Sequence, residues 1–222
     1  MRTLAALLIP ATIAAPCGGA WAQSFEIGGY FGWQSAPHSG VRGDYPTGAA
    51  GTGSYDFTTG WDGKSFEAPP HYGIRATWWF ADRQGVALDF NHTKVYADPD
   101  TAAANGFDRL ELTDGLNVAT LNYMYRFPDV SARITPYVGA GVGFTVPHVD
   151  VTTGGSRTFE YQFGGPAVAA IAGVQYEITG PWSAFAEYKG TYSRNELDLS
   201  GGGTLDTDIV TNAVNAGVTF NF

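Results

Sequence analysis

Short segments in which apolar and polar residues alternate dominate the sequence after residue 23, and this pattern predicts β-strands with one apolar face. In "TPYVGAGVGFTV", for example, Val138, Val142 and Phe144 share one face, while Tyr137 and glycines occupy the other. Eight such segments occur, at residues 24–34, 71–81, 85–97, 116–127, 135–146, 166–178, 181–193 and 208–222. Eight one-sided strands of about ten residues predict an all-β protein, an antiparallel barrel with an even number of strands.

The connections between these segments alternate in length. Three are short turns, at 82–84, 128–134 and 179–180, and four are long, at 35–70, 98–115, 147–165 and 194–207. Short turns on one side and long loops on the other are typical of barrels in a bacterial outer membrane. The chain also ends in alternating Val218, Phe220 and Phe222, similar to the strand that the outer-membrane assembly machinery reads. We therefore predict an eight-stranded antiparallel transmembrane β-barrel with long external loops.

A soluble barrel of the lipocalin kind is the structural alternative. It would turn the apolar faces inward and leave the charged residues in water. Alternation alone does not distinguish the inside of a barrel from its outside. The aromatic ends of the strands, the asymmetry of the loops and the terminal Phe222 favour the membrane barrel.

The first residues have the composition of an export signal. Met1 and Arg2 form a short positive region, residues 4–15 are mostly apolar, and Ala20-Trp21-Ala22 offers a cleavage site. We predict a signal peptide at 1–22 and a barrel domain at 23–222. The one cysteine, Cys17, lies inside the signal, and Pro16 before it fits a lipoprotein signal poorly. The mature chain then has no disulfide, thiolate metal site or cysteine nucleophile.

The charged residues argue against one class of partner and indicate what fills the barrel interior. The formal net charge of −9 argues against nucleic-acid binding, which needs a basic surface. An eight-stranded barrel is only wide enough for its own side chains, so inward charges are expected to neutralise one another. These are Arg75, Arg126 and Lys189 against Glu26, Asp89, Glu177 and Glu187. A filled lumen argues against a conducting pore and directs the search for function to the external loops and rim.

All four histidines lie at or beyond the predicted external strand ends, and carboxylates accompany them. His148, for example, precedes Asp150 by two residues, so both can point to one side of a strand. Imidazole and carboxylate groups from separate strands can bind a divalent metal ion or act as acid and base. In the simpler interpretation, loop carboxylates hold bridging cations while lysine and arginine contact lipopolysaccharide phosphates. The sequence has no compact metal motif, no GxSxG and no nucleotide loop.

Several blocks resemble the lipid A oxidase family of outer-membrane enzymes described in rhizobia. They are "APHSGVRG", "GKSFEAPPHYGIRATWW", "LDFNHTKVYAD", "LELTDGLNVATLNYMYR", "TPYVGAGVGFTVPHVDV" and "EYQFGGPA", and the similarity runs from about residue 25 to the C-terminus. The resemblance implies oxidation of the proximal glucosamine of lipid A to 2-aminogluconate, with O2 as co-substrate and H2O2 released. It also implies a divalent metal ion, and lipid A or lipopolysaccharide of the outer leaflet as the partner. We expect a monomer in the bacterial outer membrane.

The expected site combines the histidines with nearby charges. The hypothesis for metal ligands and acid–base residues is His38, His92 and His148 with Glu67 or Asp114, and the reserve is His71, Asp150, Glu160 and Gln162. The residues expected to bind the substrate phosphates are Lys64, Lys94, Arg42 and Arg157.

Two other functions stay open on the sequence. A non-enzymatic structural or binding barrel would leave lipid A unchanged. A lipid A acyl-chain hydrolase would need a serine beside a histidine or an acid, and Ser39 next to His38 or Ser65 near Glu67 could supply it.

Overall fold

The computed structural model describes residues 23–222, so the expected signal peptide lies outside the described residues. The strands are β1 (Ser24–Asp44), β2 (Ser54–Asp62), β3 (Tyr72–Trp79), β4 (Gln84–His92), β5 (Val95–Ala97), β6 (Arg109–Leu112), β7 (Val118–Arg126), β8 (Ile134–Thr145), β9 (His148–Thr153), β10 (Ser156–Tyr161), β11 (Gly165–Thr179), β12 (Trp182–Leu199) and β13 (Gly203–Asn221). Two short helices, α1 (Pro99–Ala104) and η1 (Pro128–Val130), connect strands. No helix among the described residues is long and apolar enough to cross a membrane.

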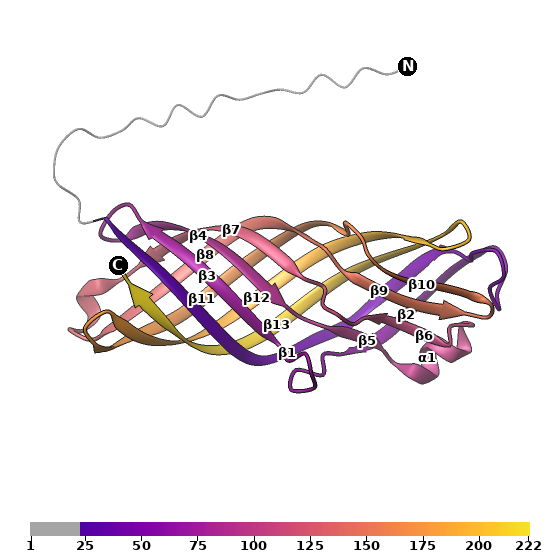
Figure 1. The fold of residues 1–222 in the computed structure, drawn as a ribbon, viewed down its shortest axis with the longest axis horizontal. Coiled ribbons are helices and arrows are strands. Elements are labelled where there is room, and N and C mark those ends of the chain that lie inside the picture. Colours follow the sequence, from indigo (N-terminus) through magenta and orange to yellow (C-terminus); the bar gives the residue numbers. More distant parts are fainter. Residues whose placement is uncertain (1–22) are drawn as a thin grey trace, which may run out of the picture.

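A closed antiparallel barrel occupies one end of the elongated molecule (Figure 1). Its ring is β1, β3, β4, β7, β8, β11, β12 and β13, and it closes because β1 pairs with both β3 and β13. Ile27, for instance, lies opposite Ala76 on one side and Phe220 on the other. Each predicted segment contributes one strand of this ring, so the predicted eight-stranded antiparallel barrel is confirmed. We call this part the lower barrel.

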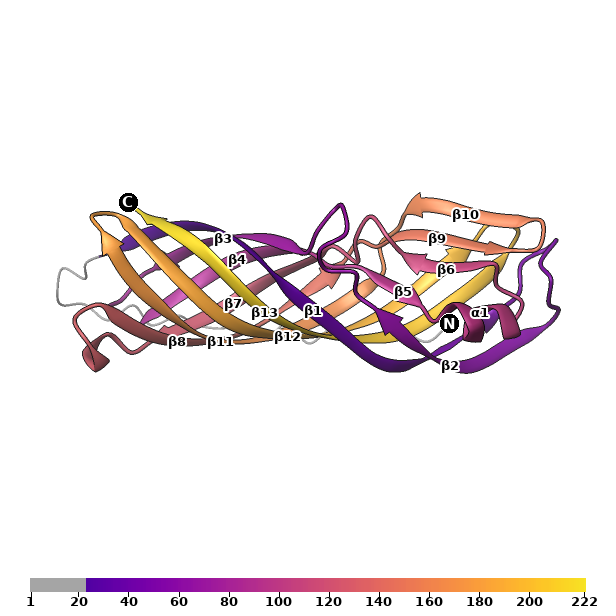
Figure 2. The same ribbon diagram turned by 90° about the horizontal axis from the view of Figure 1, so that it is seen from below.

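The long external connections are present as predicted, and most of their length forms strands. β1, β12 and β13 continue past the lower barrel, and residues 194–207 are two paired strands joined by a turn at 200–202. The remaining predicted loops contain β2, β6 and the β9–β10 hairpin. Together these strands extend the same sheet beyond the ring, in the order β12-β13-β1-β2-β5-β6-β9-β10 (Figure 2). We call this extension the upper barrel.

Side chains close the upper barrel between β10 and β12, whose edges have no backbone ladder in the described pairings. The Gln162 amide donates to the Asp198 carbonyl at 2.8 Å and accepts from the Asp198 N–H at 2.9 Å. The Ser156 hydroxyl donates to the Ser200 carbonyl at 2.7 Å, and the Ser200 N–H donates to Thr158 at 2.8 Å. These side chains form hydrogen bonds with backbone N–H and C=O groups at the strand edge. Without them, these backbone groups would be free to pair with another chain. We call this line of contacts the seam.

The interior of the lower barrel is polar. Arg75 donates to Asp89 at 2.7 Å and to Glu187 at 2.7 and 2.8 Å, while Lys189 also pairs with Asp89. The outward face carries exposed apolar side chains, among them Phe31, Ile74, Leu88, Leu121, Val142 and Val214. Polar groups inside and apolar groups outside are the arrangement of a barrel surrounded by lipid. The expected neutralisation of inward charges is confirmed for these pairs.

The second expected pair of inward charges, Arg126 and Glu26, lies at the end of the lower barrel where the strands connect by short turns. Arg126 approaches Glu26 at 3.7 Å, as expected. Glu177 differs from the expectation, because its side chain is exposed at the end of β11 rather than placed within the charge network.

The interior of the upper barrel is apolar. Val41, Val95 and Leu116 are fully buried there, and Phe107 packs at ring distances of 5.1 Å from Tyr55 and 5.6 Å from Tyr45. Apolar inside and mostly polar outside is the arrangement of a barrel in water. The lipocalin-like alternative required apolar side chains inside and polar side chains outside along the whole chain. The structure has that arrangement in the upper barrel alone.

Candidate functional site

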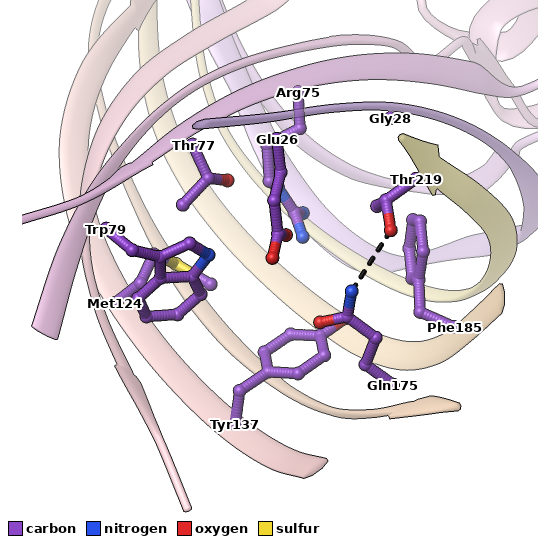
Figure 3. Close-up of a pocket in the computed structure, with 10 residues that line it drawn as sticks. All are labelled: Glu26, Gly28, Arg75, Thr77, Trp79, Met124, Tyr137, Gln175, Phe185 and Thr219. Carbon is purple, nitrogen blue, oxygen red and sulfur yellow. Dashed lines mark hydrogen bonds between the residues drawn. The ribbon is translucent and has the colours of Figure 1, made fainter. Parts of the chain in front are cut away.

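The lumen of the lower barrel has little free space. Figure 3 shows a cavity between Glu26, Arg75, Trp79, Tyr137 and Gln175, with the Glu26 carboxylate directed into it. Its volume is about 20 Å³, which is enough for about one water molecule. Above it, the Arg75 and Lys189 ion pairs fill the barrel, and farther out lies the apolar core of the upper barrel. A sugar or lipid therefore does not fit into the lumen, and the site must be sought on the outside.

Polar residues gather where the two barrels meet. Short segments at 63–71, 93–94, 113–117 and 146–147 join the lower strands to the upper ones. We call the following set the junction band: Lys64, Glu67, His92, Lys94, Asp114 and His148. The charge of Asp114 acts on both His92 and Lys94, and that of Glu67 acts on Lys94. All six were expected site residues, and each of them has a charge interaction with another member of the band.

His148 and Asp114 form the clearest chemical pair in the band. His148 Nδ1 lies 3.9 Å from Asp114 Oδ2, is buried and has no hydrogen-bond partner. The imidazole is held edge-on by the rings of Phe159 at 4.5 Å and Tyr161 at 4.7 Å. The Asp114 side chain is 53 % exposed, whereas that of His148 is 5 % exposed. A fixed imidazole beside an accessible carboxylate is an arrangement that can take up and release a proton.

His92 is the second fixed imidazole. Its Nδ1 lies 3.1 Å from Asn117 Oδ1, and its ring stacks on Tyr72 at 5.1 Å. Its Nε2 is buried with no hydrogen-bond partner. Gly115 makes this packing possible, because its φ is +97° and a Cβ there would come within 2.4 Å of His92 Nδ1.

The band lies at the upper limit of the apolar outer surface. Ile74 shares the outward face of β3 with Tyr72, and Phe144 of β8 packs against the exposed Phe163 at 5.8 Å. Aromatic residues concentrate where a bilayer meets water. We infer that the junction band lies at the level of the lipid head groups.

Two cavities open on the outer surface beside the band. One, of about 460 Å³, is lined by Trp33, Gln34, Ser35, Trp61, Asp62, Gly63, Lys64, Ser65, Phe66 and Glu67. The other, of about 530 Å³, is lined by Ala36, His38, Gly60, Trp61, Asp62, Lys64, Tyr96, Ala97, Asp98, Pro99 and Glu111. Because they share Trp61, Asp62 and Lys64, we treat them as one groove, the outer groove. Cavities of this size suit a small ligand or head group.

The expected metal ligands do not form a cluster. His38 is exposed in the outer groove beside Gly60, whereas His148 contacts Asp114 and the rings of β10. Within residues 23–222, no group of three or more His, Cys, Asp or Glu side chains could hold a metal ion. The set of His38, His92 and His148 with one carboxylate therefore does not fit a three-ligand centre, and no chemical step is assigned to it.

The reserve residues have structural partners. His71 points into the lumen, where its Nε2 lies 3.0 Å from Asn215 Oδ1. Asp150 is buried between Arg109 at 3.1 Å and Arg157 at 3.4 Å. Glu160 and Gln162 hydrogen-bond to each other at 3.1 Å beside the seam.

The four expected phosphate-binding residues separate into two groups. Lys64 and Lys94 belong to the junction band. Arg157 is occupied by Asp150 and by the Phe159 ring, 4.6 Å away. Arg42 is exposed on β1, in register with Asp206 on one side and Asp56 on the other, and lines neither cavity.

Sequence reasoning missed the aromatic residues that hold the site. Tyr72 and Phe159 position the two imidazoles, and Tyr96 lies between the band lysines. A signal for Phe159 existed, because "TFEYQF" places Phe159, Tyr161 and Phe163 at alternate positions. Tyr96 lies in a strand of only three residues, which is too short for its alternation to be read.

Comparison with solved structures gives the same fold. The outer membrane protein OprG from Pseudomonas aeruginosa is similar at 19% identity, with 92% of this chain and 98% of that chain covered and a TM-score of 0.54. Neisserial surface protein A (NspA) matches at 17% identity, covering 89% and 97%, with a TM-score of 0.48. AlkL in lipid bilayers matches at 15% identity, covering 94% and 95%, also with a TM-score of 0.48. No curated protein sequence matches the chain.

A family model covers nearly the whole sequence. The model of the outer membrane protein beta-barrel domain matches residues 3–222. The lower barrel, with its polar interior and apolar surface, agrees with that match. The protein is therefore located in the bacterial outer membrane, and the chain belongs to the outer membrane protein beta-barrel domain family.

Proposed function

We propose that this protein is an enzyme that modifies lipid A in the outer leaflet, oxidising the proximal glucosamine to 2-aminogluconate. One observation carries the proposal: His148 Nδ1 lies 3.9 Å from Asp114 Oδ2 and has no hydrogen-bond partner, in a band that we infer to lie at the head-group level. A lipid embedded in the leaflet could bring its sugar to this pair without leaving the membrane. The resemblance of the loop-adjacent blocks to lipid A oxidases supplies the reaction.

The reaction constrains what these residues can do. Oxidation of the C1 hemiacetal to a lactone removes two electrons and two protons, which convert O2 to H2O2, and water then opens the lactone to the acid. In this proposal His148 takes the proton of the C1 hydroxyl, the Phe159 and Tyr161 rings hold the imidazole, and the Asp114 carboxylate, 3.9 Å away, stabilises its charged form. Side chains do not carry electrons to O2 unaided, so a redox group must complete the reaction. We propose only the proton transfer for residues of this chain.

The hydrolase alternative is less well supported. Ser39 Oγ accepts from Trp61 Nε1 at 2.8 Å and lies 3.3 Å from the Thr207 hydroxyl. Ser65 Oγ accepts from the Gln34 N–H at 2.9 Å and donates to the Gln34 carbonyl at 3.1 Å. The Ser39 hydroxyl thus contacts two side chains and the Ser65 hydroxyl contacts backbone, and neither has a described hydrogen bond to a histidine that would activate it.

The test is the lipid A mass spectrum of a host whose lipid A has a free C1 hydroxyl and lacks this modification, recorded with and without oxygen. We expect an oxygen-dependent gain of one oxygen atom with the natural protein. His148→Gln should lower the rate at least about a hundredfold, which is the usual contribution of an acid–base residue. Asp114→Asn should lower it less, and Arg42→Gln is the control.

Other outcomes of this experiment are equally clear. Loss of an acyl chain would indicate a hydrolase. Unchanged lipid A, with the barrel folded in the outer membrane, would contradict an enzymatic role. Full activity in His148→Gln would remove the proposed pair from the reaction.

A further inference from the structure

A row of aromatic residues lies on the outer surface of the upper barrel. Phe159 and Tyr161 of β10 and Phe163, two residues beyond the strand, occupy alternate positions and are 57 %, 57 % and 68 % exposed. Alternate residues of a strand point to one face, so the three rings form a single row, which we call the aromatic stripe. Of the five strands that belong to the upper barrel alone, only β10 has exposed large apolar side chains in the part of the chain that the structure describes. An apolar patch on a surface that otherwise faces water indicates an interaction site.

The lower end of the stripe touches the lipid-facing surface. The Phe163 ring lies 5.8 Å from that of Phe144, on β8 of the lower barrel. Phe144 shares the exposed apolar face of β8 with Val138 and Val142. The stripe is therefore continuous with the surface that lipid covers, and an outer-leaflet lipid is the molecule that can reach it from the membrane.

The stripe then passes the proposed proton-transfer pair. Tyr161 lies opposite His148 in the register between β10 and β9, and Phe159 lies opposite Asp150. Both rings contact the imidazole, Phe159 at 4.5 Å and Tyr161 at 4.7 Å. Two residues of an extended strand span about 7 Å, so the stripe runs for about 14 Å from Phe163 to a point beyond His148. A lipid head group extends in the same direction from its acyl chains.

The polar groups beside the stripe favour a sugar over an anionic head group. The Tyr161 hydroxyl donates to the Asp114 carbonyl at 3.4 Å, and the Asp114 side chain is 53 % exposed. Arg157 lies over the Phe159 ring at 4.6 Å, but its guanidinium is paired with Asp150. An exposed carboxylate repels a phosphate and accepts hydrogen bonds from hydroxyl groups. Aromatic rings offer flat apolar surface against which the C–H face of a sugar ring can pack.

We propose that the aromatic stripe is a docking surface for a glycolipid of the outer leaflet. Its acyl chains lie against Phe163 and Phe144, and its sugar rings lie against Tyr161 and Phe159. The stripe residues are positioning residues, because they hold the sugar beside His148 and take no part in the proton transfer. This deepens the proposed function and rests on it for the reaction, whereas binding of the glycolipid does not depend on oxidation.

Binding can be measured separately from turnover. The folded full-length protein in detergent micelles would be titrated with lipid A, and with a phospholipid that has the same acyl chains but no sugar. We expect the natural protein to bind lipid A more tightly than the phospholipid. Phe163→Ala should weaken lipid A binding about fivefold through loss of one aromatic contact, and Phe163→Tyr should keep the natural affinity. Circular dichroism checks that each variant is folded.

A second variant tests the sugar end of the stripe. Phe159→Leu keeps an apolar side chain beside His148 but removes the flat ring face. We expect it to weaken lipid A binding and to leave phospholipid binding unchanged. Equal affinity of the natural protein for the two lipids would overturn the assignment to a glycolipid.

Phe66→Ala is the matched control. Phe66 is also a strongly exposed aromatic residue, but it follows β2, and β2 and β10 lie at opposite ends of the row β2-β5-β6-β9-β10. Its removal should leave lipid A binding unchanged. Equal weakening by Phe66→Ala and Phe163→Ala, or no weakening by Phe163→Ala, would overturn the stripe as the docking surface.

Kinetics distinguish this proposal from the proposed function. In the oxidation assay, Phe163→Ala should raise KM about fivefold and leave kcat unchanged, because the lost contact lies away from the reacting atoms. Oxidation with the natural KM in Phe163→Ala would overturn the stripe. Stripe-dependent binding of lipid A without oxidation by the natural protein would contradict only the proposed function.

Discussion

The two barrels are built from three shared strands but are surrounded by different solvents. β1, β12 and β13 run through both, with Lys189 and Asn215 facing inward below and Leu197 and Leu205 facing inward above. Inside the lower barrel, polar groups pair with one another while apolar side chains face lipid. In the upper barrel apolar groups are inside, because water surrounds it. Along the same strand, the inward-facing side chains therefore change from polar to apolar where the bilayer ends.

This comparison also shows why a site forms at the junction. The polar interior of the lower barrel and the apolar interior of the upper barrel must change into each other at the junction. Buried histidine and lysine side chains occupy that junction. Some of their polar atoms, such as His92 Nε2 and His148 Nδ1, have no partner in the described protein. Buried polar atoms without partners are rare in structural positions and are candidates for a functional role.

The largest expected effect lies in the lower barrel. Arg75→Ala leaves Glu187 and Asp89 buried without their guanidinium, and breaking such an ion pair costs about 3–5 kcal/mol. The measurement is urea unfolding in detergent micelles. Arg42→Ala, at an exposed position, should change the unfolding free energy by less than about 0.5 kcal/mol. Similar small losses in both variants would show that the lower interior does not depend on its ion pairs.

Substitution of two leucines allows the upper core to be compared with the lipid-facing surface of the lower barrel. Leu112 is buried in the upper core and Leu121 is 57 % exposed on the lipid-facing side. Leu112→Ala should cost about 2–4 kcal/mol through lost burial and a cavity, whereas Leu121→Ala should cost about 1 kcal/mol or less. Hydrogen exchange should locate the first loss in β6 and β9 while β3 and β4 stay protected. Global loss of protection in Leu112→Ala would mean that the two barrels unfold as one unit.

The smallest expected effect is at the seam. Gln162→Ala removes both hydrogen bonds to Asp198 and should cost about 1–2 kcal/mol locally. The amide of Asp198 should then exchange about tenfold faster. The control is Gln175→Ala in the lower barrel, where backbone pairing of β11 with β12 is intact and exchange should not change. Unchanged exchange at Asp198 would show that the seam is held by other contacts.

The lower barrel could be predicted because each of its strands carries its own signal. The segment 135–146 alternates over its full length and corresponds to β8, Ile134–Thr145. The upper strands lack that length. β5 has three residues and β6 has four. The glycines at 201–203 have the composition of a loop, although they belong to a tight turn between two long paired strands. Their pairing depends on partners distant in the chain, which alternation does not reveal.

The candidate site was predictable as a set of residues but not as an arrangement. His148 and Asp114 were each expected members, and the structure places them together because the β9–β10 hairpin lies beside segment 113–117. His38 was expected in the same group, yet it follows the continuing β1 into the outer groove. That difference arises because β1 extends to Asp44 instead of ending at residue 34.

By itself, the sequence determined that the chain forms an eight-stranded barrel, because lipid imposes a period of two on every strand that crosses it. It also predicted a set of residues for chemistry outside the lumen, although His71 of that set points into the lumen. Only the tertiary structure decided that the external segments form a second barrel and which imidazole meets which carboxylate. Those outcomes depend on contacts between segments far apart in the chain, and the free energy of such contacts comes from burial rather than from any local pattern.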